Sequence, residues 1–411
     1  MKIQQLYFTH CSKGVEGISG FQFKAISSGI SFRDKAISII QQFCQRYEWP
    51  RSLDDLVCPG ELTEEEFQKF PVALHYYHID GDKFGLTRIC IARKQGSRAG
   101  NFFAHTLVFS GEALALSDYD PLSLASSNLF KSWDDSELTV LPELNNFEGI
   151  ELPEANRWLE QDCREPYISH LKNLLTSILQ GKSLQRPLII CSKEIDDTEG
   201  LIGVLLHLLP PHFRKEITFS TYELSPYRFL TGSKDVLKYP QRIIVTIPGE
   251  EGGKFQFRED EYKSTYYIFN FAQGQYSEIG KPVCPSYVEY VIKAYNSKDI
   301  TSLFNIQKLI DDFQLESKPE LWDRILPLIC FVEKQGELPK QEDLSVALLI
   351  LQEVCQNHQQ AEVGVSLLWN FVKEKFGHLT DSTLQEVFSF YKKLIERLNQ
   401  PEDYRKEIST E

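Results

Sequence analysis

The sequence predicts a mixed α and β protein built in three parts. These are an α+β N-terminal domain at residues 1–150, an α/β middle domain of the βαβ type at 151–283, and an all-α helical C-terminal region at 284–411. Short β-rich segments separated by Gly and Asp turns predict the first part, and alternating strands and helices predict the second. Apolar residues at helical spacing predict the third. The length of 411 residues also exceeds what one ordinary core accommodates.

The N-terminal domain is predicted to combine strands with two helical segments. A helix is expected to begin at Ser31, whose hydroxyl can cap its first turn, and to end near Trp49, because Pro50 disfavours helical geometry at the residue before it. A shorter capped turn is expected at Thr63, with Glu66 at the capping-box position. Five β-rich segments are predicted, of which the last three read as an antiparallel meander: 4–11, 21–26, 71–79, 86–93 and 101–110.

The middle domain is predicted from a strand, a helix and a strand in succession. The strands are expected at 188–191 and 217–222, and the helix between them at 200–209. This order makes a βαβ unit, which implies a right-handed crossover and a parallel pair of strands. The segments 242–247 and 266–271 are expected to extend the same sheet.

The C-terminal region is predicted to be helical throughout. After Pro285, apolar residues recur at i, i+3, i+4 and i+7, and the pattern predicts six helices without a fixed-period repeat. Pro327 is expected to kink or split one helix. Gly377 is expected to end another helix in a left-handed cap.

Composition narrows the classes of partner. The chain has 58 acidic and 44 basic residues, a net charge of −14, which argues against a broad phosphate-binding face and so against nucleic acid as the main partner. The sequence has no run of 18 or more apolar residues, which a membrane-spanning helix would need, and the first residues lack the apolar core of a signal peptide. Nine dispersed cysteines suit reduced core thiols. A cytoplasmic protein without a membrane segment is therefore expected.

No complete nucleotide or metal motif is found. The segment at 176–183, TSILQGKS, has Thr176 where a phosphate-binding loop needs Gly, and it ends a predicted helix. The Gly-rich segment at 248–254 is acidic and reads as a hairpin loop. His75 and His78 lie three apart on a predicted strand and so face opposite sides. No catalytic set, cofactor or metal is expected.

The most polar constellation lies in the segment SRAGNFFAHTLVF. On a strand, His105 shares a face with Phe103 and Leu107, which favours a buried histidine satisfied by hydrogen bonds. An alternative places this segment beside the first strand, as a small-ligand pocket or a cysteine–histidine dyad with Cys11. The candidate ligand or partner site comprises Tyr7, His10, Arg98, Asn101 and His105.

Three segments together resemble a known family: YFTHCSKGVEGISGFQFKAISSGI, SRAGNFFAHTLVFS and LLHLLPPHFRKEITFSTYE. They are similar to the type 2 N-terminal domain and the middle domain of the GTPase-associated protein family of bacterial conflict systems, over residues 1–280. The family-like signature is carried by Arg98, Gly100, Asn101 and His105. The resemblance implies a bacterial protein encoded beside a GTPase that acts with it in immunity against phage.

The expected function is therefore a non-enzymatic adaptor or recognition component of a GTPase-linked anti-phage defence system. Its expected partners are a locus-encoded GTPase, which supplies the nucleotide switch, and an effector protein; the sequence leaves the oligomeric state open. One alternative is an enzyme or small-ligand-binding protein whose pocket includes Tyr7, His10, Cys11, Arg98 and His105. Another is a degenerate nucleotide-binding fold in the middle domain.

Overall fold

The computed structural model describes most of the chain, and its contacts divide into two compact units. Outside the described residues lie 1, 32–33, 59, 97–98, 127, 146–156, 161–162, 185, 194–195, 225–241, 249–265, 333–339 and 399–411. Unit 1 comprises Met1–His207 and Arg214–Gly280, and unit 2 comprises Leu208–Phe213 and Lys281–Glu411. No helix in the described part of the chain has the length and apolar character needed to span a bilayer.

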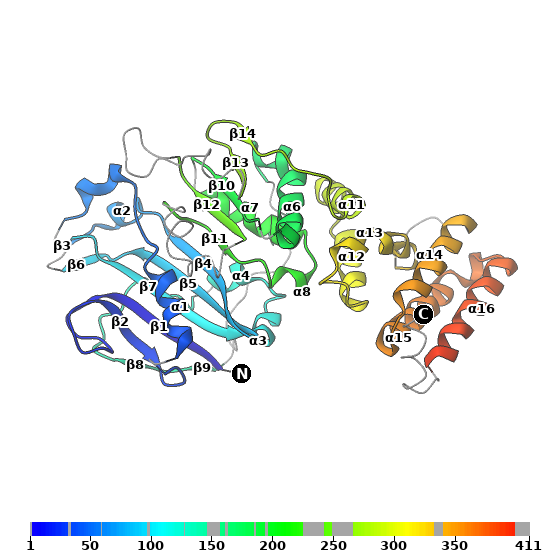
Figure 1. Cartoon of the computed structure of the whole chain (residues 1–411), viewed down its shortest axis with the longest axis horizontal. Helices are drawn as coiled ribbons and strands as arrows, with labels where there is room; N and C mark the ends of the chain where they lie inside the picture. Colours follow the sequence, from blue (N-terminus) through cyan, green and yellow to red (C-terminus); the bar gives the residue numbers. More distant parts are fainter. Residues whose placement is uncertain are drawn as a thin grey trace. The chain divides into compact units, whose positions relative to one another are not determined.

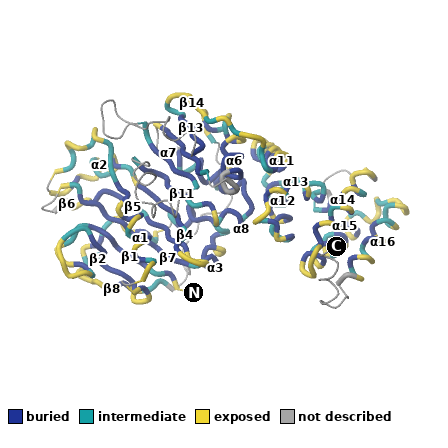
Figure 2. The backbone as a smooth tube through the Cα atoms, viewed as in Figure 1, coloured by how far each residue is buried: buried dark blue, intermediate teal, exposed yellow. Residues whose placement is uncertain are grey.

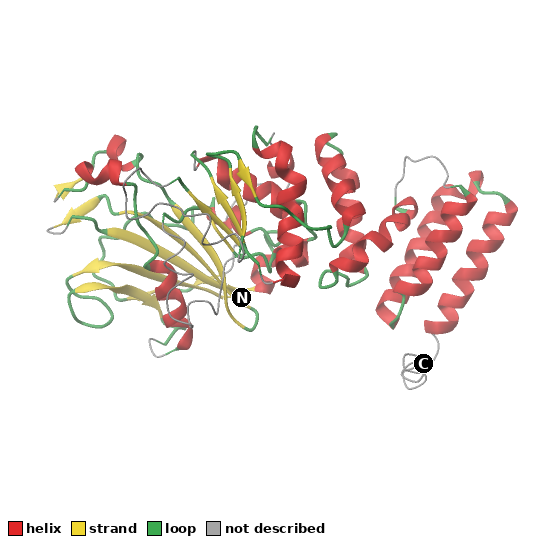
Figure 3. Ribbon diagram, turned by 45° about the horizontal axis from the view of Figure 1, so that its top comes forward, coloured by secondary structure: helices red, strands yellow, loops and turns green. Residues whose placement is uncertain are grey.

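A single large sheet organises unit 1 (Figures 1 and 3). Its 12 strands among the described residues follow the order β14-β13-β10-β12-β11-β4-β5-β7-β1-β2-β8, and β9 pairs with β1. The strands from the first part of the chain are β1 (Lys2–Cys11), β2 (Gly20–Ser27), β4 (Ala73–Asp80), β5 (Lys83–Ile91), β7 (Phe102–Ser110), β8 (Val140–Leu141) and β9 (Leu144–Asn145). The later strands are β10 (Leu188–Cys191), β11 (Phe219–Ser220), β12 (Ile243–Thr246), β13 (Tyr267–Asn270) and β14 (Gln275–Tyr276). A separate two-stranded sheet joins β3 (Gly60–Glu61) to β6 (Lys94–Gly96).

The pairing of neighbouring strands changes from antiparallel to parallel across the sheet. Strands β4, β5 and β7 form an antiparallel meander, which confirms the prediction for these segments, and β1 pairs antiparallel with β7. Strands β10 to β13 are parallel neighbours in the order β13-β10-β12-β11. The expected parallel pairing of 188–191 with 217–222 is wrong, because β12 lies between β10 and β11. All four residues of β12 are buried, as suits a central strand.

The two parts of this sheet meet where β11 pairs antiparallel with β4. Ser220 lies opposite His75 there, and the backbone of Thr221 continues the pairing by donating to the carbonyl of Leu74 at 3.0 Å. The antiparallel and parallel segments therefore share one continuous sheet, which the sequence did not predict. Figure 2 shows the strands of this sheet as largely buried, with exposed residues gathered in loops and at chain turns.

Helices cover the sheet. The first is α1 (Lys35–Cys44), which packs Ile37, Ile40 and Phe43 against the core. It begins four residues later than expected, because the side chain of Asp34 accepts from the backbone N–H of Ala36 and takes the capping role expected of Ser31. It also ends at Cys44 rather than near residue 49. The other helices of this part are α2 (Glu64–Phe67), α3 (Gly111–Ala115), α4 (Pro121–Ala125), α5 (Arg157–Glu160), α6 (Tyr167–Leu184) and α7 (Asp196–His207). The short helix α8 (Pro211–Arg214) lies in unit 2 except for its last residue.

The predicted cap at Thr63 is confirmed. The Thr63 hydroxyl accepts from the backbone of Glu66 while the Glu66 carboxylate accepts from the backbone of Thr63, which is a complete capping box. The segment 176–183 lies within α6, as its reading as helix predicts. The Gly-rich segment at 248–254 falls almost wholly outside the described residues.

The described residues of unit 2 are mainly helical, so the helices expected toward the C-terminus are present. Its elements are α11 (Pro285–Asn296), α12 (Ile300–Asp312), η3 (Pro319–Leu321), α13 (Trp322–Ile325), η4 (Leu326–Phe331), α14 (Gln341–Val354), α15 (His358–Lys375), η5 (Phe376–His378) and α16 (Asp381–Leu398). Trp322 is fully buried, and its indole N–H donates to the carbonyl of Leu315 at 2.8 Å. Pro327 sits where α13 gives way to the 3₁₀ segment η4, as expected. The left-handed cap expected at Gly377 is wrong, because the chain continues there as the 3₁₀ turn η5.

The mixed α/β class, with a large sheet in the first part and helices toward the C-terminus, is therefore confirmed. The finer division into an α+β domain at 1–150, a βαβ-type domain at 151–283 and a helical region at 284–411 stays a prediction.

Candidate functional site

The structure brings two of the predicted site residues together on one face of the sheet. Tyr7 of β1 lies directly opposite His105 of β7, with ring centroids 4.8 Å apart in an edge-to-face arrangement. Both side chains are buried, at 2% and 0% exposure. The imidazole Nδ1 accepts from the backbone N–H of Lys131 at 3.0 Å. Burial, and then the positive charge of Lys131, lower the pKa of His105 to about 3, so this histidine is neutral near pH 7.

Asn101 and His10 have other roles. The Asn101 side-chain oxygen accepts from the hydroxyl of Thr9 and from the backbone N–H of His10, both at 3.1 Å, and so fixes the start of β7 against the end of β1. The His10 ring packs on Phe21, on the face of the sheet opposite to Tyr7, because successive residues of a strand alternate. Arg98 lies outside the described residues.

Gly100 of the family-like signature has a conformational reason for its identity. Its φ is +80°, a region that residues with a Cβ rarely adopt. A Cβ there would also stand 2.9 Å from the ring of Trp49. The turn before β7 therefore needs glycine.

The geometry bears on the cysteine–histidine hypothesis. Cys11 lies four residues beyond Tyr7 along β1, and Tyr7 is the residue paired with His105. At about 3.3 Å per residue, Cys11 and His105 are roughly 13 Å apart along the strands. Burial also raises the pKa of the Cys11 thiol, which disfavours the nucleophilic thiolate. The predicted residues are thus divided among a buried Tyr7–His105 pair, a structural Asn101 and a separate His10.

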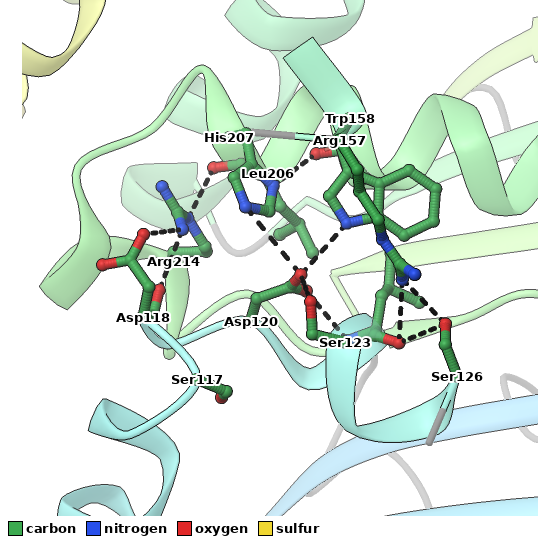
Figure 4. Close-up of polar contacts among 12 residues, drawn as sticks. Ser117, Asp118, Asp120, Ser123, Ser126, Arg157, Trp158, Leu206, His207 and Arg214 are labelled. Atoms are coloured by element: carbon green, nitrogen blue, oxygen red, sulfur yellow. Dashed lines mark hydrogen bonds and ion pairs between the residues drawn. The ribbon is translucent and has the colours of Figure 1, made fainter. Parts of the chain in front are cut away.

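A second polar centre, which the sequence did not indicate as a site, is built around Asp120 (Figure 4). Its carboxylate accepts from the backbone N–H of Leu122 at 2.9 Å and from the indole N–H of Trp158 at 3.0 Å, and also from the hydroxyl of Ser123. His207 Nε2 lies 3.8 Å from the same carboxylate. Asp120, Ser123 and His207 are each 0% exposed. The centre joins α4 to α5 and α7.

His207 is neutral in this centre. Burial, with the nearby charge of Arg214 as the second cause, lowers the pKa of His207 to about 3. The ring Nδ1 lies 2.9 Å from the carbonyl of Gly203, to which the neutral ring can donate. Ser123 donates directly to Asp120, whereas in a hydrolytic triad the histidine stands between serine and carboxylate. The arrangement is therefore that of a buried structural network.

Two arginines extend this centre. Arg214, 0% exposed, donates from Nη1 to the Asp118 carboxylate at 3.1 Å and to the Asp118 carbonyl at 2.9 Å, and from Nε to the carbonyl of Leu206 at 3.0 Å. Asp118 has a φ of 54°, so the turn after α3 adopts an uncommon backbone conformation as it presents both oxygens. Arg157 donates to the hydroxyl of Ser126 at 2.7 Å. Figure 4 shows these contacts converging from the turn after α3, α4, α5 and the α7–α8 segment.

A third polar centre lies at the junction of β4 and β11. Arg46 Nη1 lies 3.2 Å from the Glu223 carboxylate, and His75 Nδ1 lies 3.8 Å from the same oxygen. All three side chains are buried. Burial raises the pKa of Glu223, lowers that of Arg46 and holds that of His75 well below its usual value. The Arg46–Glu223 pair compensates two charges that would otherwise be costly to bury.

These three centres share a property that bears on function. Most of their titratable groups are buried, and the contacts described above are made within the protein. Among the described residues, no set of three or more His, Cys, Asp or Glu side chains is placed to hold a metal ion. The one local signal of the Asp120 centre in the sequence is Asp120 followed by Pro121, a helix-start pattern. Its partners Trp158 and His207 come from distant segments.

Comparison with known proteins locates two family matches on this fold. Residues 2–147 match the model of GTPase-associated protein 1, N-terminal domain type 2, and residues 156–273 match the model of the GTPase-associated protein 1 middle domain. No curated protein matches the chain. Asp120 lies in the first match, and Trp158, which donates to its carboxylate, lies in the second. Both matches also contribute strands to the large sheet. Since the two matches together span more than half of the sequence, in the order expected from the resemblance, the chain belongs to the GTPase-associated protein 1 family.

Proposed function

We propose that this protein is a non-enzymatic adaptor or recognition component of a bacterial GTPase-linked anti-phage defence system. The observation that carries the proposal is the way the two family domains are joined. The antiparallel pairing of β11 with β4 makes them one sheet, and the Asp120 and Arg46–Glu223 centres connect them through buried contacts. Such a joint suits a preorganised body that presents a fixed surface to a partner.

The chemistry of the buried groups supports the same proposal. A general acid or base must reach its substrate, and a nucleophile must be accessible and activated. His105 and His207 are fully buried and have strongly lowered pKa values because of that burial. Asp120 and Glu223 are engaged in hydrogen bonds or an ion pair. The nucleotide switch is therefore assigned to the GTPase partner, and this chain acts in the cytoplasm beside it.

The proposal is tested with the GTPase encoded nearest to the gene. The purified full-length chain is titrated by calorimetry with that GTPase, loaded in turn with GDP and with a non-hydrolysable GTP analogue. The expected result is binding with a Kd of about 1 μM or lower in one nucleotide state. Absence of binding in both states, together with unchanged phage plating when the gene is deleted, would contradict the proposal.

The contact of Tyr7 with His105 favours one second candidate, a small-ligand or enzymatic site on that face of the sheet. Lys131 adds a nearby ammonium group, 5.6 Å from the centre of the Tyr7 ring. Tyr7→Phe removes the hydroxyl and keeps the ring packing. Loss of phage protection in Tyr7→Phe, with stability and GTPase binding unchanged, would favour this candidate over the adaptor.

A further inference from the structure

A segment without regular structure crosses the face of the sheet that carries Tyr7 and His105. It comprises residues 130–138, here called the strap, which lie between α4 and β8 and form neither helix nor strand. Among the described residues, no hydrogen bond from backbone to backbone involves any position of the strap. Segments with few such bonds open locally at a lower free energy than the strands of a core. The strap is therefore expected to open more readily than the sheet beneath it.

Aromatic side chains seat the strap on this face. Phe130 packs on the ring of His105, with centroids 5.2 Å apart. Trp133 packs on Phe103, with centroids 5.9 Å apart, and is partly buried against the apolar cluster that includes Tyr7. The Tyr7 ring in turn contacts the rings of both His105 and Phe103. The strap therefore lies over Tyr7 and its two aromatic neighbours.

The Asp134 carboxylate fastens the strap. Its side chain is 8% exposed and lies 3.0 Å from the ammonium of Lys24 and 3.5 Å from that of Lys131. The Lys24 ammonium also donates to the backbone carbonyl of Asp134. Lys24 belongs to β2 and Lys131 to the strap itself, so the contact of Lys24 with Asp134 ties the strap to the large sheet. A second pair, Asp135 with Lys94 at 2.9 Å, is exposed and contributes little.

The strap covers groups that have chemistry of their own. Tyr7, His105 and Cys90 are 2%, 0% and 3% exposed. The Cys90 thiol donates to the carbonyl of Ser132 in the strap at 3.6 Å. The backbone N–H of Lys131 donates to Nδ1 of His105, whereas Nε2 of His105 has no hydrogen-bond partner among the described residues. A buried polar group without a partner costs free energy, and opening of the strap would give this nitrogen one.

We propose that the strap is a gate that opens over Tyr7 and His105 and admits a small polar ligand to them. In the closed state, which is the one described, Asp134 fastens the strap and its aromatic side chains fill the space that the ligand enters. Opening breaks the tie to Lys24 and leaves the strands in place. The inference rests on the second candidate function for the identity of the ligand, whereas the opening itself is tested without a ligand or a GTPase.

Alkylation of Cys90 reports the opening, because its thiol lies against the strap. The full-length chain is incubated with iodoacetamide, and the modification of each cysteine is followed in time by mass spectrometry of its peptides. Cys191 is the internal reference, since it is 0% exposed in β10, between β12 and β13, and reacts only when the sheet unfolds. In the wild type, Cys90 is expected to react at least about tenfold faster than Cys191. Equal rates would show that the strap opens only with the whole sheet and would overturn the proposal.

Variants of the strap test how it is fastened. Asp134→Asn keeps the size of the side chain and removes the charge that binds Lys24. It should speed the alkylation of Cys90 at least about tenfold and leave the rate of Cys191 unchanged. Glu137→Gln is the matched control, because it also removes one negative charge from the strap but at an exposed position. It should leave both rates unchanged.

Two outcomes in Asp134→Asn would contradict the gate. An unchanged rate for Cys90 would show that the carboxylate does not fasten the strap. An equal rise for Cys90 and Cys191 would show that the variant unfolds the whole sheet more often, without a separate opening of the strap. If Asp134→Asn does not fold, the comparison of the two thiols in the wild type still decides whether the strap opens, whatever the outcome of the GTPase titration.

Discussion

Asp120→Asn is the sharpest test of the joint between the two family domains. The amide oxygen can still accept from the backbone N–H of Leu122, but the amide nitrogen is only a donor and accepts from neither Ser123 nor the Trp158 indole. At least one buried donor is left unsatisfied, at a cost of about 1–3 kcal/mol. The negative charge that acts on half-buried Arg157 is also lost.

The expected destabilisation is about 1–3 kcal/mol, the cost of leaving a buried donor unsatisfied. For a unit of this size, each kcal/mol lowers Tm by roughly 2–4 °C, so a decrease of about 2–12 °C is expected. The assay is thermal and urea unfolding of the full-length chain. Hydrogen exchange should show faster exchange in α5 and α7, the helices that carry Trp158 and His207.

Asp34→Asn is the matched control for this variant. Asp34 is also an aspartate that caps a helix by accepting from the N–H two residues on, at 3.1 Å from Ala36, but it is exposed. Asparagine caps about as well as aspartate, so this change should stay within about 0.5 kcal/mol. A loss in Asp120→Asn as small as that of Asp34→Asn would refute the role assigned to the buried carboxylate.

Three further predictions test the other buried contacts. His105→Asn can keep the acceptor for the backbone N–H of Lys131 and removes a group that titrates. Since the folded pKa of His105 is about 3 and the unfolded value about 6.5, the wild type loses stability as pH falls below 6.5, by roughly 2 kcal/mol between pH 7 and 5. Urea unfolding at both pH values should show that the free energy of unfolding of the variant falls by about 2 kcal/mol less than that of the wild type over this range. Gly203→Ala would place its Cβ 2.4 Å from the Trp158 ring and should cost about 1–3 kcal/mol in chemical denaturation; an unchanged midpoint would contradict this packing. Arg46→Met leaves Glu223 buried without its cation and should cost about 3–5 kcal/mol, and adding Glu223→Gln should recover part of that loss, which a double-mutant cycle measures; strict additivity would argue against the pair.

Local features of the chain were predictable because they depend on neighbours in sequence. The antiparallel meander, the capping box at Thr63 and Glu66 and the helical C-terminal region follow from periodicity and turn residues within a few positions. Even here, choices among nearby residues were not determined: Ser31 and Asp34 are both good capping residues, and the structure uses Asp34. Packing of α1 on the sheet, which no local pattern specifies, selects between such close alternatives.

The predicted site was located only in part. The sequence indicated His105 as a buried strand residue and Tyr7 as a neighbour under an assumed pairing, and the register of β1 with β7 places them opposite each other. The same register sends His10 to the other face, because a strand alternates its side chains with a period of two. Apart from the helix-start pattern of Asp120 and Pro121, no sequence pattern indicated the centre around Asp120.

By itself, the sequence determined the class of the fold, the helical character of the C-terminal part and the family resemblance. The tertiary structure decided how the two family domains join. The contacts that join them link residues far apart in the chain: 38 positions separate Asp120 from Trp158, and 177 separate Arg46 from Glu223. A buried charge is tolerated only when its partner is in place, and no local pattern records which distant residue that partner is. Sequence periodicity therefore determines which face of an element is buried, whereas only the folded chain determines what meets that face.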